Sequence, residues 1–425
     1  MRIIGHLDMD AFFAAAEERE KPWLTGAPIV VGADPKGGAG RGVVSTANYK
    51  AREYGIRSAL PISKAWRLSE TAKKKGVPPA LFLSGNFPLY AEISRRVMAI
   101  IAKYSPVVEV ASVDEAYFDL SQAGSFGQAE KISRRVKKEI LKKEQLTASI
   151  GIGPNKLIAK IASDFQKPDG LTVVPAEEAE AFLEPMALKK IPGIGPKTEQ
   201  IFLRKGIKTV RGLKQYSREE LASMLGKWGR ALWQKARGED NSPLETEYER
   251  KSIGEESTFE EDVASPGIIV EELVSLSHDV FRRFARKEFK TFRTVAIKVR
   301  FADFVTKMRA HTLKAGVSDL QTLQREALKL FLPFLDRREN PTRKQFRLIG
   351  VRIEKLDPIV ESPFRGSDRE LRGKIVALLS KKEGKLSLSK LSQETGGGEK
   401  KIKRLIHSLA KEGFVQVEKG VVKVS

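Results

Sequence analysis

The chain has 425 residues, of which 41% are hydrophobic and 8% aromatic, so it is long enough and apolar enough for several folded domains. It carries 76 Lys and Arg against 54 Asp and Glu, a formal net charge of +22, and this excess favours a polyanionic partner such as nucleic acid. The absence of cysteine excludes disulfides, thiolate zinc sites and cysteine nucleophiles.

Neither a histidine-rich metal site nor a membrane segment is indicated. The four histidines lie far apart in the sequence, so a bound metal would be held by oxygen ligands. The N-terminal stretch is interrupted too soon by charge to be a signal peptide, and no run of about 18 apolar residues occurs. We expect a monomeric, cytoplasmic and nucleoid-associated protein with no membrane partner.

The first 165 residues alternate between predicted strands and helices. Apolar runs predict strands at residues 2–8, 27–32, 43–45 and 147–152. Helical spacing predicts helices at residues 11–19, 48–54, 90–104, 129–144 and 155–165. The β-rich stretch 107–120 predicts a hairpin, and the glycine-rich stretch 37–42 predicts a loop. This order of elements is typical of an α+β fold.

The second half divides at two polar segments. Short helices are predicted over residues 177–237, and the polar stretch that follows is a linker candidate. A second α+β domain is predicted from helices at 267–287 and 320–335 and from strands at 294–301 and 346–356. The last 60 or so residues predict three helices and a hairpin over 414–424, turning at 418–420. That order resembles a winged helix-turn-helix.

Acidic residues form the most informative pattern. Asp8 and Asp10 end the first predicted strand, and Asp114 and Glu115 lie inside the predicted hairpin. Carboxylates flanked by apolar strand residues are costly to bury as unpaired ions, and oxygen ligands suit Mg²⁺ or Mn²⁺. Two such ions about 4 Å apart can activate a primer 3′ hydroxyl and stabilise a leaving pyrophosphate.

The two neighbouring acids in the predicted hairpin can serve one site only if the backbone departs from a regular strand. Neighbours on a regular strand point to opposite faces, so Asp114 and Glu115 can share a site only at a turn or bulge. The alternative is a solvated acidic hairpin tip, with Asp8 capping a helix.

Cationic and hydroxyl groups suited to a triphosphate occur at a helix start. Thr46, Tyr49 and Arg52 lie at positions i, i+3 and i+6, and Lys160 on a later helix can add a fourth contact. Each of them alone is better explained as an ordinary surface residue. The stretch 151–156 lacks the spacing of a phosphate-binding P-loop, which we therefore reject.

A glycine turn between short helices indicates a contact with DNA phosphate. In the stretch 191–197, Gly193 and Gly195 can expose backbone N–H groups, and Lys197 adds charge, as in helix-hairpin-helix motifs. The alternative is a plain glycine-rich turn.

Six stretches together resemble the Y-family DNA polymerases of the DNA polymerase IV (DinB) type. They occur in the family's order at residues 6–14, 45–52, 111–117, 149–167, 191–197 and 251–259. The resemblance covers roughly residues 1–356. It implies a right-hand arrangement with a ferredoxin-like palm, small fingers, a helical thumb containing the helix-hairpin-helix, and an α+β little finger.

The resemblance also implies boundaries. These are palm at 1–10 and 79–167, fingers at 11–78, thumb at 168–237, a linker at 238–249 and little finger at 250–356. A second linker at 357–367 precedes a winged-helix-like module at 368–425, which is an addition to the family pattern.

The resemblance assigns roles residue by residue. Metal ligands and catalytic groups are Asp8, the Met9 backbone carbonyl, Asp114 and Glu115, with two Mg²⁺ ions per site and Mn²⁺ as an alternative. Nucleotide contacts are Phe12, Phe13, Thr46, Tyr49, Arg52 and Lys160. Phe13 stands where the family places the ring that excludes a ribose 2′-hydroxyl, although without this context a core phenylalanine is the simpler explanation. Asp10 is expected to be structural.

The resemblance also has implications for the fidelity of synthesis and for DNA binding. Small residues at Ser45, Ser58 and Ala59 would form the roof over the nascent base pair, which implies weak shape selection and tolerance of damaged templates. No stretch resembles a proofreading exonuclease. In the presumed little finger, basic residues near four phenylalanines would follow the DNA backbone while the phenylalanines build the core, and the basic contacts are Arg293, Lys298 and Arg300.

Two departures from the family stand out. Ala11 replaces an aromatic residue that is frequent after the second acid, and the chain ends without the family's clamp-binding peptide, so recruitment to a sliding clamp has no clear motif. The basic third helix of the added module can bind duplex DNA or dock a protein.

The function expected from the sequence is translesion synthesis by a template-directed DNA polymerase of low fidelity, acting on primer-template DNA and dNTP by two-metal-ion nucleotidyl transfer. The alternatives are a non-catalytic DNA-binding scaffold and a palm-fold nucleotide cyclase.

Overall fold

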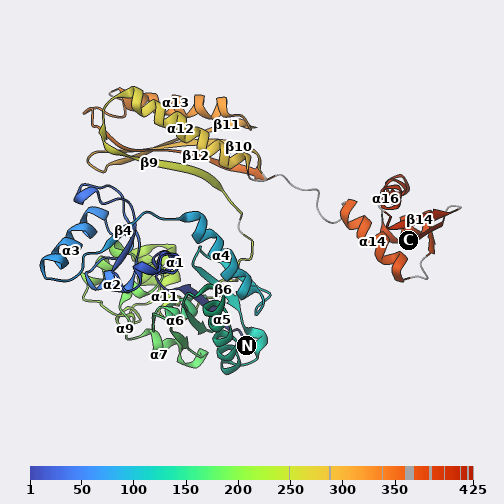
Figure 1. Cartoon of the computed structure of the whole chain (residues 1–425), viewed down its shortest axis with the longest axis horizontal. Helices are drawn as coiled ribbons and strands as arrows, with labels where there is room; N and C mark the ends of the chain where they lie inside the picture. Colours follow the sequence, from blue (N-terminus) through green and yellow to red (C-terminus); the bar gives the residue numbers. More distant parts are fainter. Residues whose placement is uncertain are drawn as a thin grey trace. The chain divides into compact units, whose positions relative to one another are not determined.

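The computed structural model describes residues 1–247, 249–286, 289–336, 338–358, 368–381, 385–396, 398–411, 413–418 and 421–424 (Figure 1). The chain divides into two compact units, Met1–Glu249 and Arg250–Ser425. None of the helices in these described ranges has the length and apolar character needed to cross a bilayer.

The first unit is built on a five-stranded sheet in the order β5-β6-β1-β7-β8. Its strands are β1 (Ile4–Met9), β5 (Val108–Val110), β6 (Glu115–Asp119), β7 (Ala148–Gly153) and β8 (Leu171–Val173). All neighbours are antiparallel except β7 and β8. With α4 (Phe87–Ala102) after β1 and α5 (Phe126–Glu144) after β6, the chain follows a β-α-β-β-α-β order, which is the ferredoxin-like palm that was predicted.

Because side chains alternate along each strand, the two faces of this sheet pack against different helices. Leu7 of β1, Phe118 of β6 and Ile150 of β7 point into the core under α4 and α5. Their neighbours point to the other face, which is covered by α6 (Lys156–Ser163). Asp8 and Glu115 belong to this second face.

Helix α1 (Phe12–Glu20) follows β1 after a sharp turn. Ala11 adopts the left-handed conformation with φ 45°, and the helix then buries Phe12 and Ala16 in the palm core. Although the sequence groups this helix with the fingers, its apolar side therefore packs on the palm.

The rest of the fingers has its own small core. A three-stranded sheet is formed by β2 (Ile29–Gly32), β3 (Val44–Ala47) and β4 (Leu81–Leu83), in the order β3-β2-β4. The helices α2 (Tyr49–Glu53) and α3 (Ile62–Lys74) pack on it around Val30, Ala51 and Ile62. The glycine-rich stretch predicted as a loop contains a short 3₁₀ turn at Lys36–Gly38.

Short helices dominate after β8, as predicted. They are α7 (Ala179–Leu183), α8 (Pro196–Leu203), α9 (Val210–Leu213), α10 (Arg218–Leu225) and α11 (Lys227–Lys235). The polar segment that follows is docked on the palm rather than free, because Arg2 Nη1 donates to the Asp240 carbonyl at 3.2 Å and Glu245 N donates to the Glu109 carboxylate at 2.8 Å.

The second unit begins with a four-stranded antiparallel sheet in the order β11-β10-β12-β9. Its elements are β9 (Ser252–Val263), α12 (Pro266–Ala285), β10 (Phe289–Phe301), β11 (Thr306–Val317), α13 (Leu320–Leu335) and β12 (Phe346–Pro358). Both helices pack on one face, around Phe284, Phe292 and Phe331. The predicted role of phenylalanines in building this core is confirmed.

The C-terminal module has a core of its own. Its elements are α14 (Asp368–Lys381), β13 (Lys385–Ser387), α15 (Leu388–Thr395), α16 (Glu399–Lys411), β14 (Val415–Glu418) and β15 (Val421–Val424). The three strands form an antiparallel sheet in the order β13-β15-β14. Most of the predicted linker, residues 359–367, and the predicted turn at 419–420 lie outside the described residues.

Every helix and strand named from the sequence is present, with its ends shifted by a few residues. The elements that the sequence did not indicate are α3, β4, β8, β9, β11 and β13.

A close backbone contact holds α6 against the palm sheet and gives the first prediction. A Cβ added at Gly151 of β7 would lie 2.1 Å from the Ala159 carbonyl oxygen and 2.2 Å from the Ser163 nitrogen, both in α6. Gly151→Ala should therefore lower the free energy of unfolding by about 1–3 kcal/mol, measured by chemical denaturation followed by circular dichroism.

The matched control is Gly127→Ala in α5, where an added Cβ meets no atom within 4 Å. This change should leave stability unchanged or raise it by up to about 1 kcal/mol. Equal effects of the two substitutions would contradict the tight contact between α6 and β7.

Candidate active site and nucleic-acid interface

The carboxylates of the first motif meet those of the second across paired strands. Asp8 of β1 lies directly opposite Glu115 of β6 in the antiparallel register. Asp114 lies in the turn before β6, where its carbonyl accepts a hydrogen bond from Met9 N at 3.0 Å. The turn required for Asp114 and Glu115 to serve one site is therefore present.

Two lysines neutralise these acids. Lys160 Nζ donates to both carboxylate oxygens of Glu115 at 2.7 Å, and Lys167 forms an ion pair with Asp8. Burial raises the pKa of Asp8 to about 7; Lys167 opposes the shift, and the charges of Glu115 and Asp114 add to it. The site thus holds more negative charge than its surroundings readily accommodate.

The same acids line a hollow of about 310 Å³. Asp8, Glu115, Lys160, Lys189 and Lys190 are among the residues that line it. Asp114 is not one of the lining residues, and its Oδ1 accepts a hydrogen bond from Ser112 Oγ at 2.6 Å. Among the described residues, no three His, Asp or Glu side chains already stand in a metal-holding cluster. The oxygen donors and their ammonium counter-ions nevertheless fit a hard cation that would displace the lysines.

A buried histidine supports this face of the sheet. His6 Nδ1 lies 2.7 Å from Ser163 Oγ, and its Nε2, which has no hydrogen-bond partner within the described residues, lies 3.9 Å from a Glu115 oxygen. Burial and the charges of three nearby lysines hold the pKa of His6 well below its ordinary value. The ring is therefore a neutral packing element beneath the carboxylates.

The Asp10 carboxylate is hydrogen-bonded within the palm and does not line the hollow. Its carboxylate accepts hydrogen bonds from Ser149 Oγ and from Asp169 N, both at 2.8 Å, and only 4% of the residue is exposed. These partners agree with the structural role expected for it.

Three of the four residues expected to contact the triphosphate come from two neighbouring elements. Thr46 lies on β3, whereas Tyr49 and Arg52 lie on α2, whose first turn is capped by the Asn48 side chain. The Arg52 guanidinium stacks over the Tyr49 ring at 4.5 Å. Burial, reinforced by Asp10, raises the pKa of Tyr49 to about 12, so its phenol keeps its proton and can donate.

Phe12 and Phe13 have different surroundings. Phe12 is only 2% exposed and belongs to the palm core, so the structure gives no open surface at this residue. The Phe13 ring is half-buried and stacks on Tyr90 with centroids 4.3 Å apart and planes 11° apart. Tyr90 in turn donates to the buried Glu17 carboxylate at 2.6 Å.

The glycine turn of the predicted helix-hairpin-helix lies between a 3₁₀ turn (Leu188–Lys190) and α8. Gly193 adopts φ 99°, and a Cβ there would lie 2.4 Å from the Trp228 ring, so glycine is required. Gly193, Gly195 and Lys197 are exposed, which leaves their backbone and charge open to a partner.

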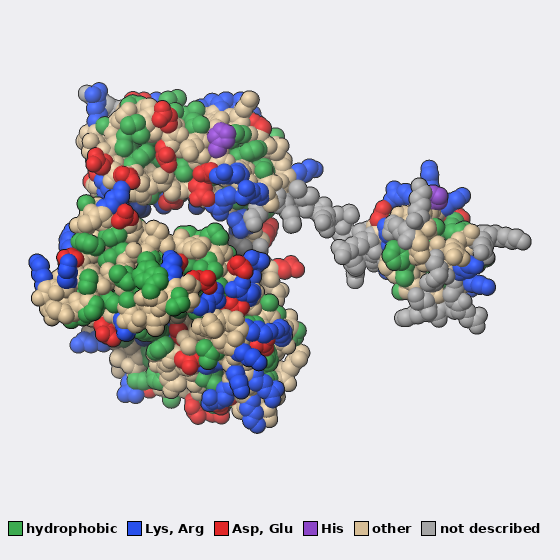
Figure 2. Space-filling model, in the orientation of Figure 1, with side chains coloured by type: hydrophobic (Ala, Val, Ile, Leu, Met, Phe, Trp, Pro, Cys, Tyr) green, Lys and Arg blue, Asp and Glu red, His purple; other side chains and the backbone are tan. Residues whose placement is uncertain are grey.

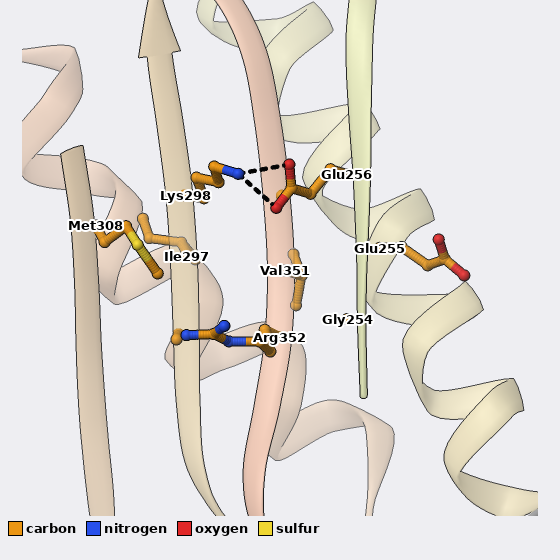
Figure 3. Close-up of a pocket in the computed structure, with 10 residues that line it drawn as sticks. Gly254, Glu255, Glu256, Ile297, Lys298, Met308, Val351 and Arg352 are labelled. Atoms are coloured by element: carbon orange, nitrogen blue, oxygen red, sulfur yellow. Dashed lines mark hydrogen bonds and ion pairs between the residues drawn. The ribbon is translucent and has the colours of Figure 1, made fainter. Parts of the chain in front are cut away.

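The helix-free face of the second unit's sheet carries the other predicted contacts. A hollow of about 390 Å³ opens there, and Lys298, Met308 and Arg352 are among the residues that line it (Figure 3). Gly254 and Gly350, which have no side chain, and the small Ala296 also line it. Lys298 donates to both oxygens of Glu256 at 2.8 Å. Arg300 donates to Thr306 Oγ1 on the same face.

Arg293 lies apart from these two residues, at an irregularity in the pairing of β10 with β11, where Nη2 reaches the Lys314 carbonyl. Lys298 and Arg300 therefore share one face, whereas Arg293 lies nearer the start of the strand, at the irregularity.

Sequence reasoning missed several residues that shape the site. Lys167 pairs with Asp8, and Tyr90 supports Phe13, yet neither was assigned a role. The only signal for Lys167 was its place at the end of a matched motif, before the turn residues Pro168 and Asp169.

Family models match three parts of the chain. The model described as the impB/mucB/samB family matches residues 7–164, and its C-terminal domain matches residues 250–365. The model described as the thumb domain of DNA polymerase-iota matches residues 189–240.

Curated relatives agree with these models. The chain is 42% identical to DNA polymerase IV of Methanoculleus marisnigri over 356 residues, covering 84% of this chain and 95% of the relative. It is 43% identical to DNA polymerase IV 2 of Methanosarcina mazei, covering 84% of this chain and 92% of the relative. The chain belongs to the Y-family DNA polymerases of the DNA polymerase IV type.

Solved structures of Y-family enzymes resemble the polymerase as well. A Y-family DNA polymerase chimera, Dbh-Dpo4-Dbh, is 29% identical with a TM-score of 0.73, covering 83% of this chain and 99% of the chimera. An insertion ternary complex of Dbh DNA polymerase is 27% identical with a TM-score of 0.58, covering 84% of this chain and 99% of that one.

The polymerase is therefore a DNA-directed DNA polymerase of the translesion type, and a non-catalytic scaffold or a nucleotide cyclase is not favoured. The family models end at residue 365, before the C-terminal module.

An acid on the basic sheet face gives the second prediction. Glu256 holds Lys298 in an ion pair, so Glu256→Gln should release this lysine and remove a negative charge that repels phosphate. DNA binding by the polymerase should tighten about three- to tenfold at 50 mM salt, measured by fluorescence anisotropy.

Glu271→Gln on α12, which packs on the opposite face of the sheet, is the control and should leave affinity unchanged. Weaker binding by the Glu256 variant, or equal gains from both, would show that this face does not meet DNA.

Proposed function

We propose that the polymerase extends a DNA primer by nucleotidyl transfer from a dNTP at the hollow lined by Asp8 and Glu115. The observation that carries the proposal is the register of β1 with β6, which places these two acids opposite each other with Asp114 in the adjoining turn. Basic groups from the palm and thumb line the same hollow.

Asp8, Asp114, Glu115 and the Met9 carbonyl are the residues that would hold two Mg²⁺ ions, or Mn²⁺ in their place. Their donors are all oxygen, and two of the carboxylates already attract ammonium groups. When bound, such ions activate the primer 3′ hydroxyl and neutralise the departing pyrophosphate. The protein itself shields the carboxylates from bulk water and, through the pairing of β1 with β6, keeps Asp8 opposite Glu115.

The triphosphate would be held by four groups on the finger and palm sides. Tyr49 donates as a neutral phenol, Arg52 contributes a fixed positive charge, and Thr46 adds a hydroxyl. Lys160 is paired with Glu115 in the free protein, and it would be free to pair with triphosphate oxygens if Glu115 held a cation instead.

Phe13 would select the sugar by shape. Its ring is backed by the parallel Tyr90 ring, whose hydroxyl is tied to Glu17 and whose position is therefore fixed. A rigid aromatic surface under the deoxyribose leaves no space for a 2′-hydroxyl.

The roof over the base pair would be permissive. Ser45 is half-buried and Ser58 and Ala59 are exposed, so little side-chain bulk stands there. Weak shape selection favours synthesis across damaged bases at low fidelity.

DNA would be held mainly through its phosphates. The exposed turn with Gly193 and Gly195 offers backbone N–H groups, and the sheet face with Lys298 and Arg300 offers cations. If about six phosphates are neutralised in all, affinity should fall by about three decades between 50 and 200 mM salt.

The third prediction tests the metal ligands. Asp114→Asn keeps the size of the side chain but removes its charge, so primer extension should fall by at least about a thousandfold while DNA affinity stays within about twofold. Single-nucleotide insertion kinetics and anisotropy measure the two effects.

Asp164→Asn is the matched control, because this carboxylate lines the same hollow but is 52% exposed and paired with Lys190. It should retain extension within about threefold. Full activity of the Asp114 variant would remove that residue from the catalytic site.

The fourth prediction concerns sugar choice. Phe13→Ala should raise the efficiency of ribonucleotide insertion relative to deoxyribonucleotide insertion by at least about a hundredfold, since the steric barrier is lost. Tyr90→Leu should give a smaller rise, because the gate ring loses its support.

Phe165→Ala, at an exposed ring outside the fingers, should leave sugar choice unchanged. If the Phe13 variant discriminates like the wild type, its ring does not contact the ribose.

A further inference from the structure

The C-terminal module carries a basic helix face that neither the proposed reaction nor the family match uses. We propose that this module is a second duplex-DNA-binding unit, which contacts the phosphate backbone through the exposed face of α16.

The fold of the module places α16 where a DNA-reading helix belongs. Helices α15 and α16 follow one another closely, and a three-stranded antiparallel sheet with the hairpin β14–β15 completes the module. This helix, strand, helix, helix, hairpin order is that of the winged helix-turn-helix predicted from the sequence. An α-helix with its side chains is about 10–12 Å across, which matches a major groove about 12 Å wide.

Burial divides α16 into two faces. Ile402, Leu405, Ile406 and Leu409 lie in the module's core. The opposite face is exposed at positions spaced i, i+3, i+4 and i+7, which are Lys400, Lys403, Arg404 and His407. A single polar stripe therefore runs along the outer side of the helix, in a module with fourteen Lys and Arg against seven Asp and Glu over residues 368–425.

The stripe is only partly neutralised by the module itself. Arg404 pairs with Asp368 at 2.6 Å, which fixes it near the start of α14. For Lys400 and Lys403, the described residues provide no ion pair. Figure 2 shows Lys and Arg side chains gathered on the surface of the C-terminal module. Two ammonium groups one turn apart, with no ion pair to the part of the chain that the structure describes, suit successive phosphates of one strand.

The chemistry of the stripe favours DNA over a protein surface. Its exposed positions carry no large apolar side chain, whereas the centre of a protein interface is usually apolar and depleted in charge. Because the polymerase already binds DNA, a covalently attached second contact becomes intramolecular and prolongs residence on the duplex without new contacts at the active site.

The test uses the full chain and a labelled blunt duplex of about 40 base pairs, titrated by anisotropy between 50 and 300 mM salt. The double variant Lys400→Gln/Lys403→Gln should lower the slope of log affinity against log salt by about two and weaken binding at 150 mM salt about ten- to thirtyfold. The control is Lys374→Gln/Lys385→Gln, which removes the same charge from exposed positions on α14 and β13.

An unchanged slope and affinity in the α16 variant, or equal losses in both variants, would overturn the proposal and leave the stripe to an acidic protein partner. All four lysines are exposed, so both variants should fold, which thermal unfolding checks. Single-nucleotide insertion at saturating short primer-template should be unchanged in the α16 variant. Asp114→Asn should bind the duplex like the wild type, so failure of the module and failure of the catalytic site are distinguishable.

Discussion

The rest of the catalytic unit depends on two carboxylates that face each other across paired strands and require positive charge nearby. Asp8 and Glu115 stand in register, Asp114 is one residue away, and burial already raises the pKa of Asp8 to about 7. Like charges in such surroundings are unfavourable unless cations compensate them. Lys160 and Lys167 provide that compensation in the free protein, and divalent ions would replace it during catalysis.

The supporting structure brings those cations within reach. Helix α6 approaches the sheet closely because Gly151 has no side chain, and this approach carries Lys160 to Glu115. At the end of β1, the chain turns sharply at Ala11 into α1. Phe13 therefore lies only a few residues after Asp8. Its ring is fixed by Tyr90 and Glu17 rather than by local sequence.

Much of this arrangement could be predicted from the sequence. Apolar periodicity indicated the central palm strands and helices, and the two acidic motifs indicated a metal site with its geometric condition at Asp114. Strands β9 and β11 were missed because they are the edges of their sheet, and most β11 side chains are exposed, so no alternating apolar pattern marks them. The partners of Asp8 and Phe13 were missed because Lys167 and Tyr90 are distant in sequence and are brought close only by the fold.

The C-terminal module, which lies beyond the family match, also presents positive charge that would contact DNA phosphates. Its core is independent of the polymerase domains, and its charge lies on the side of α16 that the core leaves exposed. Phosphate contacts in the thumb turn, the little-finger sheet and this helix would each add a modest, salt-dependent contribution to one grip on DNA.

The most direct test of the metal-centred account is a crystal structure of the polymerase with primer-template, a non-hydrolysable dNTP and Mn²⁺, examined by anomalous scattering. The account predicts two anomalous peaks about 4 Å apart, contacting Asp8, Asp114 and Glu115, with Lys160 and Lys167 moved off the carboxylates. An absence of peaks at these side chains, with both lysine pairs intact beside bound nucleotide, would contradict it.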